Sequence, residues 1–282
     1  MDRICLLLLF VLYISETNSS HPLPVDFKNK MVIEVGLPKS GTSSIFEGLR
    51  LLGIESAHYN LPHEECESLL PLQGVNVSSG RSHTTWPEIR SSDGCYIAEF
   101  IQKALSEGKD PLAYLLTEKH SFQAFLQIDA CRPPPQSNFC IIPQVFALDQ
   151  LSKAYPDAYY LMTTRLTLSQ HAASMHAWAN MLLRFEHFGY FSMFPGQSPN
   201  NSVIDNGILM IDGMQNITRS YFHHNPHLRF LEICLEDPHS GPRIAKFLGI
   251  PSFPIVRVNS GQYKGSRTAS PTYQHTFAPY FP

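Results

Sequence analysis

Short apolar runs alternate with amphipathic segments along much of the chain. Residues 31–35 form a run that ends at Gly36, and apolar residues at helical spacing follow between positions 45 and 52. This order predicts a strand, a glycine-bearing turn and a helix that stops at Gly53. Further strands are predicted at 54–57, 124–129, 158–163 and 228–235. Further helices are predicted at 110–118, from 145 to the stop at Pro156, at 167–184 and at 241–248.

The alternation of strands and helices indicates the fold class. We predict an α/β fold, a three-layer sandwich with a central, mostly parallel sheet between helices. Residues 60–95 are polar and have no clear period, so an irregular insertion is expected there. Residues 96–100 fit either a strand or the start of a helix. The length of 282 residues suits one domain, placed at residues 21–282.

Residues 1–20 have the pattern of a secretory signal. Arg3 precedes an unbroken apolar run over residues 5–14, and small residues follow it. A membrane-spanning helix needs about 20 apolar residues, whereas the core of a signal peptide needs roughly 7–15. We therefore expect a signal peptide rather than an uncleaved anchor, and a protein of the secretory pathway, in the Golgi lumen or secreted. Contact with a membrane is expected only if this segment is retained.

Glycosylation sequons and cysteines agree with that compartment. The sequon asparagines are Asn18, Asn76, Asn200 and Asn216. An odd number of cysteines remains after the signal, so at least one thiol is free or bonded to another chain. Cys131 and Cys140 flank a proline-rich loop and are the best candidates for a disulfide. Cys234 lies in an apolar strand pattern and is predicted to be a small buried side chain.

The composition excludes several classes of protein. Apolar residues make up 43% of the chain and charged residues 16%, which excludes a highly charged disordered protein. The formal charge is −3, so no strongly basic field is present and no nucleic-acid partner is expected. The chemistry of the protein must therefore be sought in local motifs.

The turn after the first strand has the glycine spacing of a phosphate-binding loop. Gly36 and Gly41 stand where the P-loop pattern GxxxxGK[ST] has its glycines, which indicates a P-loop NTPase-like fold. Backbone N–H groups of such a turn converge near a helix N-terminus, where the helix dipole favours an anion. The lysine expected after the second glycine is absent, because Thr42 stands there, and Lys39 lies inside the loop instead.

A second departure from the nucleoside triphosphatase pattern is an arginine at the end of a later strand. In P-loop triphosphatases a later strand supplies an aspartate that holds Mg²⁺. Here the strand predicted at 158–163 leads to Arg165. An arginine at this place suits a second phosphate and repels a metal ion, so no metal is expected.

These motifs resemble the sulfotransferases that use 3′-phosphoadenosine 5′-phosphosulfate (PAPS). Residues 38–43 match the PKSGTT-type loop of that family, and Arg165 followed by a helix matches its second signature. Residues 230–249 add a third likeness, a strand, Glu-Asp-Pro and a helix ending in Phe-Leu-Gly. The resemblance implies PAPS as co-substrate and no metal.

The resemblance also assigns binding roles. The loop would grip the 5′-phosphosulfate through Pro38, Lys39, Ser40, Gly41, Thr42 and Ser43. Arg165 and a serine on the following helix would hold the 3′-phosphate. Ala173 stands at the family's usual serine position, so we assign the role to Ser174, one residue further on, with Ser169 as the alternative.

The implied reaction is an in-line displacement at sulfur on a hydroxyl acceptor, which is a glycan, a peptide or a small molecule. Lys39 would stabilise the charge that develops on the leaving oxygen. The acceptor hydroxyl needs a base within hydrogen-bond reach. Asp129, at the end of its predicted strand, and His58, after the second strand, are the candidates, and His120 is a weaker third.

Two other functions remain open at this point. One is a P-loop kinase or NTPase, and the other is a non-catalytic secreted protein that keeps the fold. The remaining conspicuous side chains have simpler interpretations. Trp178 and Tyr190 are expected in the core rather than along an acceptor site. The histidines 223, 224 and 227 and the tail cations Lys264 and Arg267 are expected in solvent.

Overall fold

The computed structural model describes residues 30–61, 90–91, 94–117, 122–132, 139–178 and 180–256. The predicted signal, the tail cations, His120, and the sequons at Asn18 and Asn76 lie outside the described residues. No helix within the described residues is long and apolar enough to cross a membrane.

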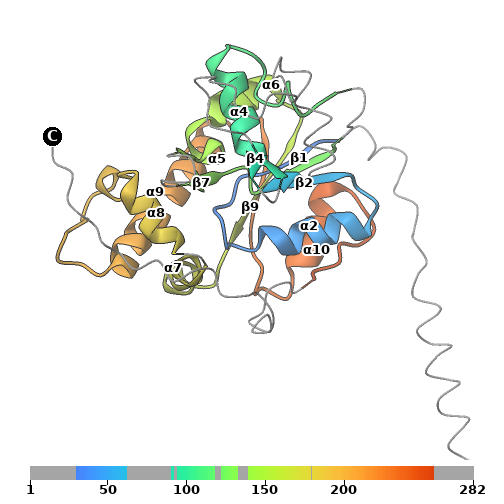
Figure 1. Cartoon of the computed structure of the whole chain (residues 1–282). Coiled ribbons are helices and arrows are strands. Elements are labelled where there is room, and N and C mark those ends of the chain that lie inside the picture. Colours follow the sequence, from blue (N-terminus) through green and yellow to red (C-terminus); the bar gives the residue numbers. More distant parts are fainter. Residues whose placement is uncertain are drawn as a thin grey trace, which may run out of the picture.

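A five-stranded parallel sheet forms the centre of the fold (Figure 1). Its strands are β1 (Val32–Glu34), β2 (Ser56–His58), β6 (Ala124–Leu126), β9 (Tyr159–Thr164) and β10 (Arg229–Cys234). Their order across the sheet is β10-β9-β1-β6-β2. Ile33 of β1 pairs with Phe125 of β6 on one side and with Tyr160 of β9 on the other. The strand order therefore changes direction at β1, the first strand in the chain.

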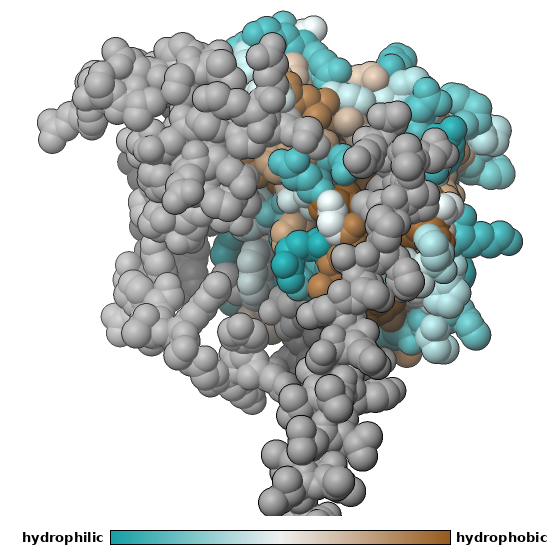
Figure 2. Space-filling view, turned by 90° about the vertical axis from the view of Figure 1, so that its right-hand side faces the viewer, coloured by the Kyte–Doolittle hydropathy of each residue, from teal (hydrophilic) through white to brown (hydrophobic). Residues whose placement is uncertain are grey.

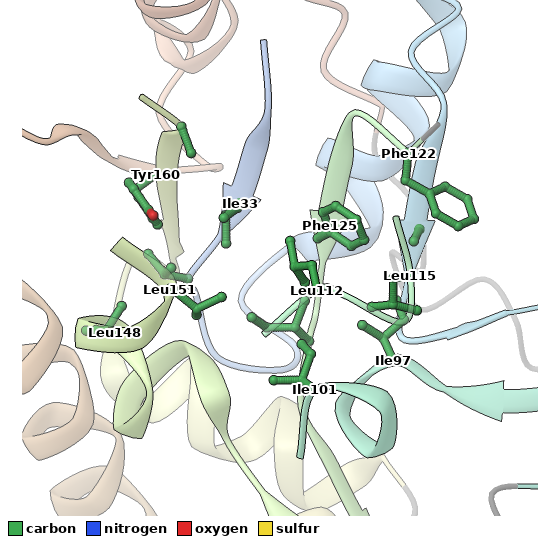
Figure 3. Close-up of a cluster of buried hydrophobic side chains, with 14 of the residues drawn as sticks. Ile33, Ile97, Ile101, Leu112, Leu115, Phe122, Phe125, Leu148, Leu151 and Tyr160 are labelled. Atoms are coloured by element: carbon green, nitrogen blue, oxygen red, sulfur yellow. The ribbon is translucent and has the colours of Figure 1, made fainter. Parts of the chain in front are cut away.

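Helices cover both faces of this sheet, which confirms the predicted three-layer α/β class. Val32 packs in a core cluster with α2 (Thr42–Leu51) and α10 (Ser240–Leu248). The next residue, Ile33, points to the other face, toward α4 (Ile97–Ser106) and α6 (Leu148–Ala154). Figure 3 shows this second cluster around Ile33, Phe125 and Tyr160. Because both faces of the sheet are covered, the central strands β1, β6 and β9 are fully buried, whereas β2 and β10 at its edges are only partly buried.

A third apolar cluster joins the helices beside the sheet. It links α5 (Pro143–Phe146), α7 (Leu168–Ala177), α8 (Met181–His187), the 3₁₀ helix η3 (Phe191–Met193) and α9 (Val203–His224). The single helix predicted at 167–184 is wrong, because it breaks into α7 and α8. Asn180 takes the left-handed conformation with φ 54°, which asparagine tolerates better than most residues, and it begins α8.

The helix predicted at 110–118 is also wrong. The Asp110 side chain accepts a hydrogen bond from the backbone N–H of Leu112, and consecutive turns follow. Such a local bond competes with helix formation. The helix lies earlier, at Ile97–Ser106, and directly follows β5 (Gly94–Tyr96), so residues 96–100 contain both a strand end and a helix start.

Two further elements end earlier than their patterns predict. The strand expected at 124–129 stops at Leu126, because Gln127 has a positive φ of 49°. The helix expected from 145 to Pro156 is divided at Ala147 into α5 and α6. The last strand and the last helix are confirmed, and Gly249 ends α10 in the left-handed conformation.

Short antiparallel pairs flank the central sheet. The segment expected to be irregular carries paired strands at its ends: β3 (Asn60–Leu61), β4 (Arg90–Ser91) and β5 form a three-stranded sheet. In a second pair, β7 (Ala130–Arg132) and β8 (Phe139–Ile141), Cys131 and Cys140 lie opposite each other and form the predicted disulfide.

Cys234 does not behave as expected. It is a free thiol and only half-buried, and its Sγ donates to Glu236 Oε2 at 3.2 Å. The prediction of a small buried side chain is therefore wrong, because Cys234 ends β10 at the edge of the core. The described sequon residues Asn200 and Asn216 are both exposed.

The described surface exposes few large apolar side chains. Its five exposed large apolar side chains, all from different elements or loops, are Leu51, Phe146, Leu166, Met193 and Ile217. Figure 2 shows polar residues over much of the described surface on one face, with smaller apolar groups between them.

Candidate active site

A cavity of about 130 Å³ opens at the carboxyl ends of the central strands. It adjoins β1, where the strand order changes direction, and ligands of open α/β sheets bind at such a point. Its described lining consists of Lys39, Gly41, Thr42, Ser43, Ser44, His58, Tyr59, Gln127, Arg165, Ser174 and Trp178.

The turn between β1 and α2 has the shape of an anion site. Gly41 is the N-cap of α2 and has a φ of 125°, which favours glycine. No side chain caps the helix, and its first turn contains no acidic residue. The N-terminal amides and the positive end of the helix dipole therefore remain available to an anion.

A buried carboxylate fixes this turn from behind. Glu34 Oε1 accepts hydrogen bonds from the N–H of Gly36 at 2.9 Å and from Thr163 Oγ1 at 2.6 Å. Thr163 also pairs with Ser40 Oγ at 2.5 Å, so β1, β9 and the loop are tied together. Burial raises the pKa of Glu34 to about 7. Glu34 was not among the predicted site residues, although a glutamate inside an apolar run is itself a signal.

Lys39 stands at the tip of the turn. Its φ is 66°, and its ammonium lies 5.3 Å from the ring centroid of Trp178. Burial, and then the positive charge of Arg165, lower the pKa of Lys39. Two cationic side chains therefore share one cavity, which favours an anionic ligand between them.

The second predicted binding pair also reaches the cavity. Arg165 follows β9, and its Nε lies 2.6 Å from Glu236 Oε1 in an ion pair. Ser174 lies one helical turn before Trp178 on α7, and both line the cavity. Ser169 is exposed at the start of the same helix and is not among the lining residues, so the geometry favours Ser174 for the assigned role.

His58 lies at the end of β2 in the same cavity. Its Nε2 is 3.3 Å from Thr42 Oγ1, and Thr42 donates its hydrogen to Gln127 Oε1 at 3.0 Å. Because Thr42 has one hydroxyl hydrogen, this arrangement assigns the proton of the neutral ring to Nε2 and the lone pair to Nδ1. Burial, and then the charge of Lys39, lower the pKa of His58 to about 4. The ring is therefore neutral at pH 7.

The structure does not place Asp129 with these residues. It lies beyond the end of β6, is 1% exposed, and accepts a hydrogen bond from Gln144 Nε2 at 2.9 Å through Oδ1. Burial raises its pKa to about 7. The expectation that Asp129 ends the strand at the open edge is wrong, because the positive φ of Gln127 turns the chain inward first.

The cavity thus brings together seven of the predicted site residues. They are Lys39, Gly41, Thr42, Ser43, His58, Arg165 and Ser174. Pro38 and Ser40 are not among the lining residues: they are buried within the loop, and are hydrogen-bonded to α7 and β9 respectively.

Several lining residues were not among the predicted site residues. Trp178 was expected in the core and instead lines the cavity, because α7 ends there. Tyr59 packs edge-on against Trp178 with the ring centroids 5.9 Å apart. Gln127 reaches the cavity through its unusual backbone conformation. No periodic pattern marks these three residues, because each follows directly on the end of a strand or helix.

The donor set of the cavity determines which ligands it suits. None of its described lining residues carries a carboxylate, and the polar groups are ammonium, guanidinium, hydroxyl, imidazole and amide. Within the described ranges, no group of three His, Cys, Asp or Glu residues is arranged to hold a metal ion. These groups are typical of sites for phosphate or sulfate esters.

Comparison with known proteins adds a distant structural likeness. No family model matches the chain, and no curated protein matches it. Among solved structures, the sulfotransferase STF9 from Mycobacterium avium is similar to it at 16% sequence identity and a TM-score of 0.36, covering 85% of this chain and 68% of that one. At this distance the likeness carries no argument about function, which rests here on the cavity.

Proposed function

We propose that the protein is a sulfotransferase that moves a sulfuryl group from PAPS to a hydroxyl acceptor. One observation carries this proposal: Lys39, Arg165 and Ser174, from distant parts of the sequence, line a single cavity at an uncapped helix N-terminus. Two separate groups of anion-binding side chains suit a nucleotide with phosphates at both its 3′ and 5′ positions.

The same lining argues against a P-loop kinase or NTPase. Such an enzyme uses a lysine after the second glycine and a strand-terminal carboxylate for Mg²⁺. Here Thr42 stands where that lysine would be and donates a hydrogen bond to Gln127. Arg165, rather than a carboxylate, follows the strand β9. The cavity therefore favours a co-substrate that binds without a carboxylate-held metal.

In the proposed reaction the acceptor oxygen attacks sulfur while the bond from sulfur to the 5′-phosphate oxygen breaks. The products are a sulfate ester and 3′-phosphoadenosine 5′-phosphate (PAP). Lys39 stabilises the charge on the departing oxygen, and the amides at the start of α2 hold the non-bridging oxygens.

We assign the role of the base that takes the proton of the acceptor hydroxyl to His58 rather than to Asp129. His58 lines the cavity and is neutral, with a free lone pair, whereas Asp129 is buried outside the described lining. A bound anion offsets the charge of Lys39 and raises the pKa of His58 toward the range useful for a base. His58→Ala is expected to lower the transfer rate while PAP affinity stays nearly constant; an Asp129→Asn variant with the greater loss of rate would reverse the assignment.

The proposed location is the secretory pathway. The Cys131–Cys140 disulfide, together with the disulfide-bonded state of Cys95, suits an oxidising compartment. A lumenal enzyme would meet glycans, peptides and secreted small molecules as acceptors.

Calorimetry on the full chain tests the nucleotide assignment. PAP is expected to bind more tightly than adenosine 5′-monophosphate or ADP with Mg²⁺. Arg165→Ala should remove most of the advantage conferred by the 3′-phosphate, whereas the matched control Arg50→Ala, at an exposed arginine paired with Glu47, should not. Tighter binding of ADP with Mg²⁺ would favour the kinase alternative, and binding of PAPS without transfer to any acceptor would favour a non-catalytic protein.

A further inference from the structure

A fully buried histidine lies directly behind the candidate phosphate loop. His171 of α7 is 0% exposed, and its Nε2 donates a hydrogen bond to the backbone carbonyl of Pro38 at 2.8 Å. Its other ring nitrogen, Nδ1, is buried and has no partner among the described residues. A buried nitrogen without a partner costs free energy that an apolar side chain would avoid. The remaining contact, to Pro38, is therefore the interaction that this side chain contributes.

The carbonyl held by His171 belongs to the central peptide of a tight turn. The N–H of Ser40 bonds to the carbonyl of Leu37 at 3.2 Å, with Pro38 and Lys39 between them. The φ of Lys39 is 66°, and because the proline ring fixes a negative φ at the second position, a positive φ at the third position makes the turn type II. Type II normally requires glycine at this position, because a side chain strains it.

A type I turn over the same four residues would relieve that strain. The two types differ by a flip of the central peptide, which reverses the directions of the Pro38 carbonyl and the Lys39 N–H. Carbonyl and N–H point in opposite directions across a trans peptide. In the observed form the carbonyl faces α7, so the Lys39 N–H faces away from it. In the flipped form Pro38 would no longer reach the donor on His171.

We propose that His171 is a positioning residue that keeps the Pro38–Lys39 peptide in its type II orientation and thereby holds the loop ready for the 5′-anion of its ligand. This inference rests on the proposed function only in assigning the loop to the 5′ end of the nucleotide. The same helix carries Ser174 one turn later, so α7 supports the loop through His171 and faces the cavity through Ser174.

The surroundings of His171 keep its ring neutral. Arg165 and Glu236 are the charged groups that act on the His171 ring, from beyond the ends of β9 and β10. Burial is the main cause that lowers the pKa of His171 to about 4, so the ring is neutral at pH 7. A neutral ring with its hydrogen on Nε2 is the form that donates to Pro38.

The test measures binding of inorganic pyrophosphate, PAP and adenosine 3′-monophosphate to the full chain by calorimetry. His171→Leu is expected to weaken pyrophosphate and PAP about tenfold, which corresponds to about 1.4 kcal/mol, and to change adenosine 3′-monophosphate less than about twofold. His171→Gln, whose amide can donate at the position of Nε2, should restore most of the loss. His176→Leu on the same helix is the matched control, because His176 does not line the cavity or contact Pro38.

Three outcomes would overturn the inference. They are an equal loss for all three ligands in His171→Leu, no loss at all, or no recovery in His171→Gln. A further measurement needs no variant: ¹⁵N NMR of the wild-type ring should show hydrogen on Nε2 from pH 5 to pH 8, and a hydrogen on Nδ1 would contradict it. Pyrophosphate binding without PAP binding would refute the proposed function and leave the role of His171 standing, whereas binding of neither would overturn both.

Discussion

The two sides of the cavity are built in different ways. The loop side is fixed from behind by fully buried groups, with Glu34, Ser40 and His171 each bonded to the loop or to its supporting strand. The opposite side depends on Arg165, whose side chain is 32% exposed and paired with Glu236, itself 33% exposed. One side is thus ordered before a ligand arrives, whereas the other must exchange an ion-pair partner.

For the proposed sulfotransferase, this difference predicts how binding and catalysis are divided between the two sides. A rigid, preorganised donor set stabilises developing charge without further reorganisation, so the loop side suits the reacting group. A partly exposed ion pair such as Arg165–Glu236 is exchanged at smaller cost than a fully buried one, so the other side suits recognition of a spectator phosphate. We expect variants on the loop side to affect rate or folding, and variants on the other side to affect affinity.

The largest effect is expected at Lys39. Lys39→Ala removes the cation beside the leaving oxygen and should lower the single-turnover transfer rate by about 10²–10³, as loss of one preorganised donor does elsewhere. PAP affinity should fall much less. Transfer of labelled sulfate measures the rate, and Lys153→Ala, at an exposed cation on α6, is the control. A purely proportional loss in affinity and rate would contradict the division between the two sides.

The next effect concerns stability and pH. The pKa of Glu34 is raised from 4.5 to about 7 in the folded protein, so the folded state binds a proton that the unfolded state releases above about 4.5. The resulting stabilisation is complete at low pH and is lost as the pH rises through about 7. We expect the free energy of unfolding to fall between pH 5 and pH 8, by on the order of a few kcal/mol.

Glu34→Gln should flatten this dependence, because the amide does not titrate. Chemical denaturation at both pH values measures it, with Glu47→Gln as the control at an exposed carboxylate. Asp129, whose pKa is also raised to about 7, should supply a second contribution of the same sign that Asp129→Asn removes. An unchanged pH dependence of the free energy of unfolding in Glu34→Gln would show that the pKa of Glu34 is not raised in the folded protein.

A smaller effect, on PAP affinity, is expected from a serine of α7. Ser174→Ala should weaken PAP about 2–10-fold, the range for loss of one hydrogen bond, and should leave adenosine 5′-monophosphate unaffected. Ser169→Ala on the same helix is the matched control, because Ser169 is exposed and outside the described lining. A stronger effect at Ser169 would exchange the two assignments.

The smallest effect is expected at Glu236. Glu236→Gln removes the anion that competes for Arg165 and should strengthen PAP binding up to about fivefold, consistent with the worth of an exposed ion pair. The gain should shrink as the salt concentration rises, since salt screens the pair in the wild type. Weaker binding in Glu236→Gln would mean that Glu236 positions Arg165 rather than competes for it.

Patterns along the chain predicted the strands of the sheet, the candidate phosphate loop and most of the residues that line the cavity. The strands β1 and β9 are short, fully buried and mostly apolar runs, and such runs are visible in sequence. Lys39 and Arg165 could be recognised because they depart from the pattern of P-loop triphosphatases. Lys39 lies inside the loop rather than after its second glycine, and Arg165 stands where those enzymes have an aspartate. The errors fall where backbone conformation depends on one side chain, as at Asp110, Gln127 and Asn180.

Local composition was thus enough to place the candidate anion-binding loop after the first strand of an α/β sheet, since spacing and apolar runs act over short distances. Long-range packing settled which side chains meet there: it admitted His58, Trp178 and Tyr59, left Asp129 outside, and set His171 against Pro38. These contacts depend on the order of the strands in the sheet and on where the helices end in space, and neither is encoded in any single stretch of the chain.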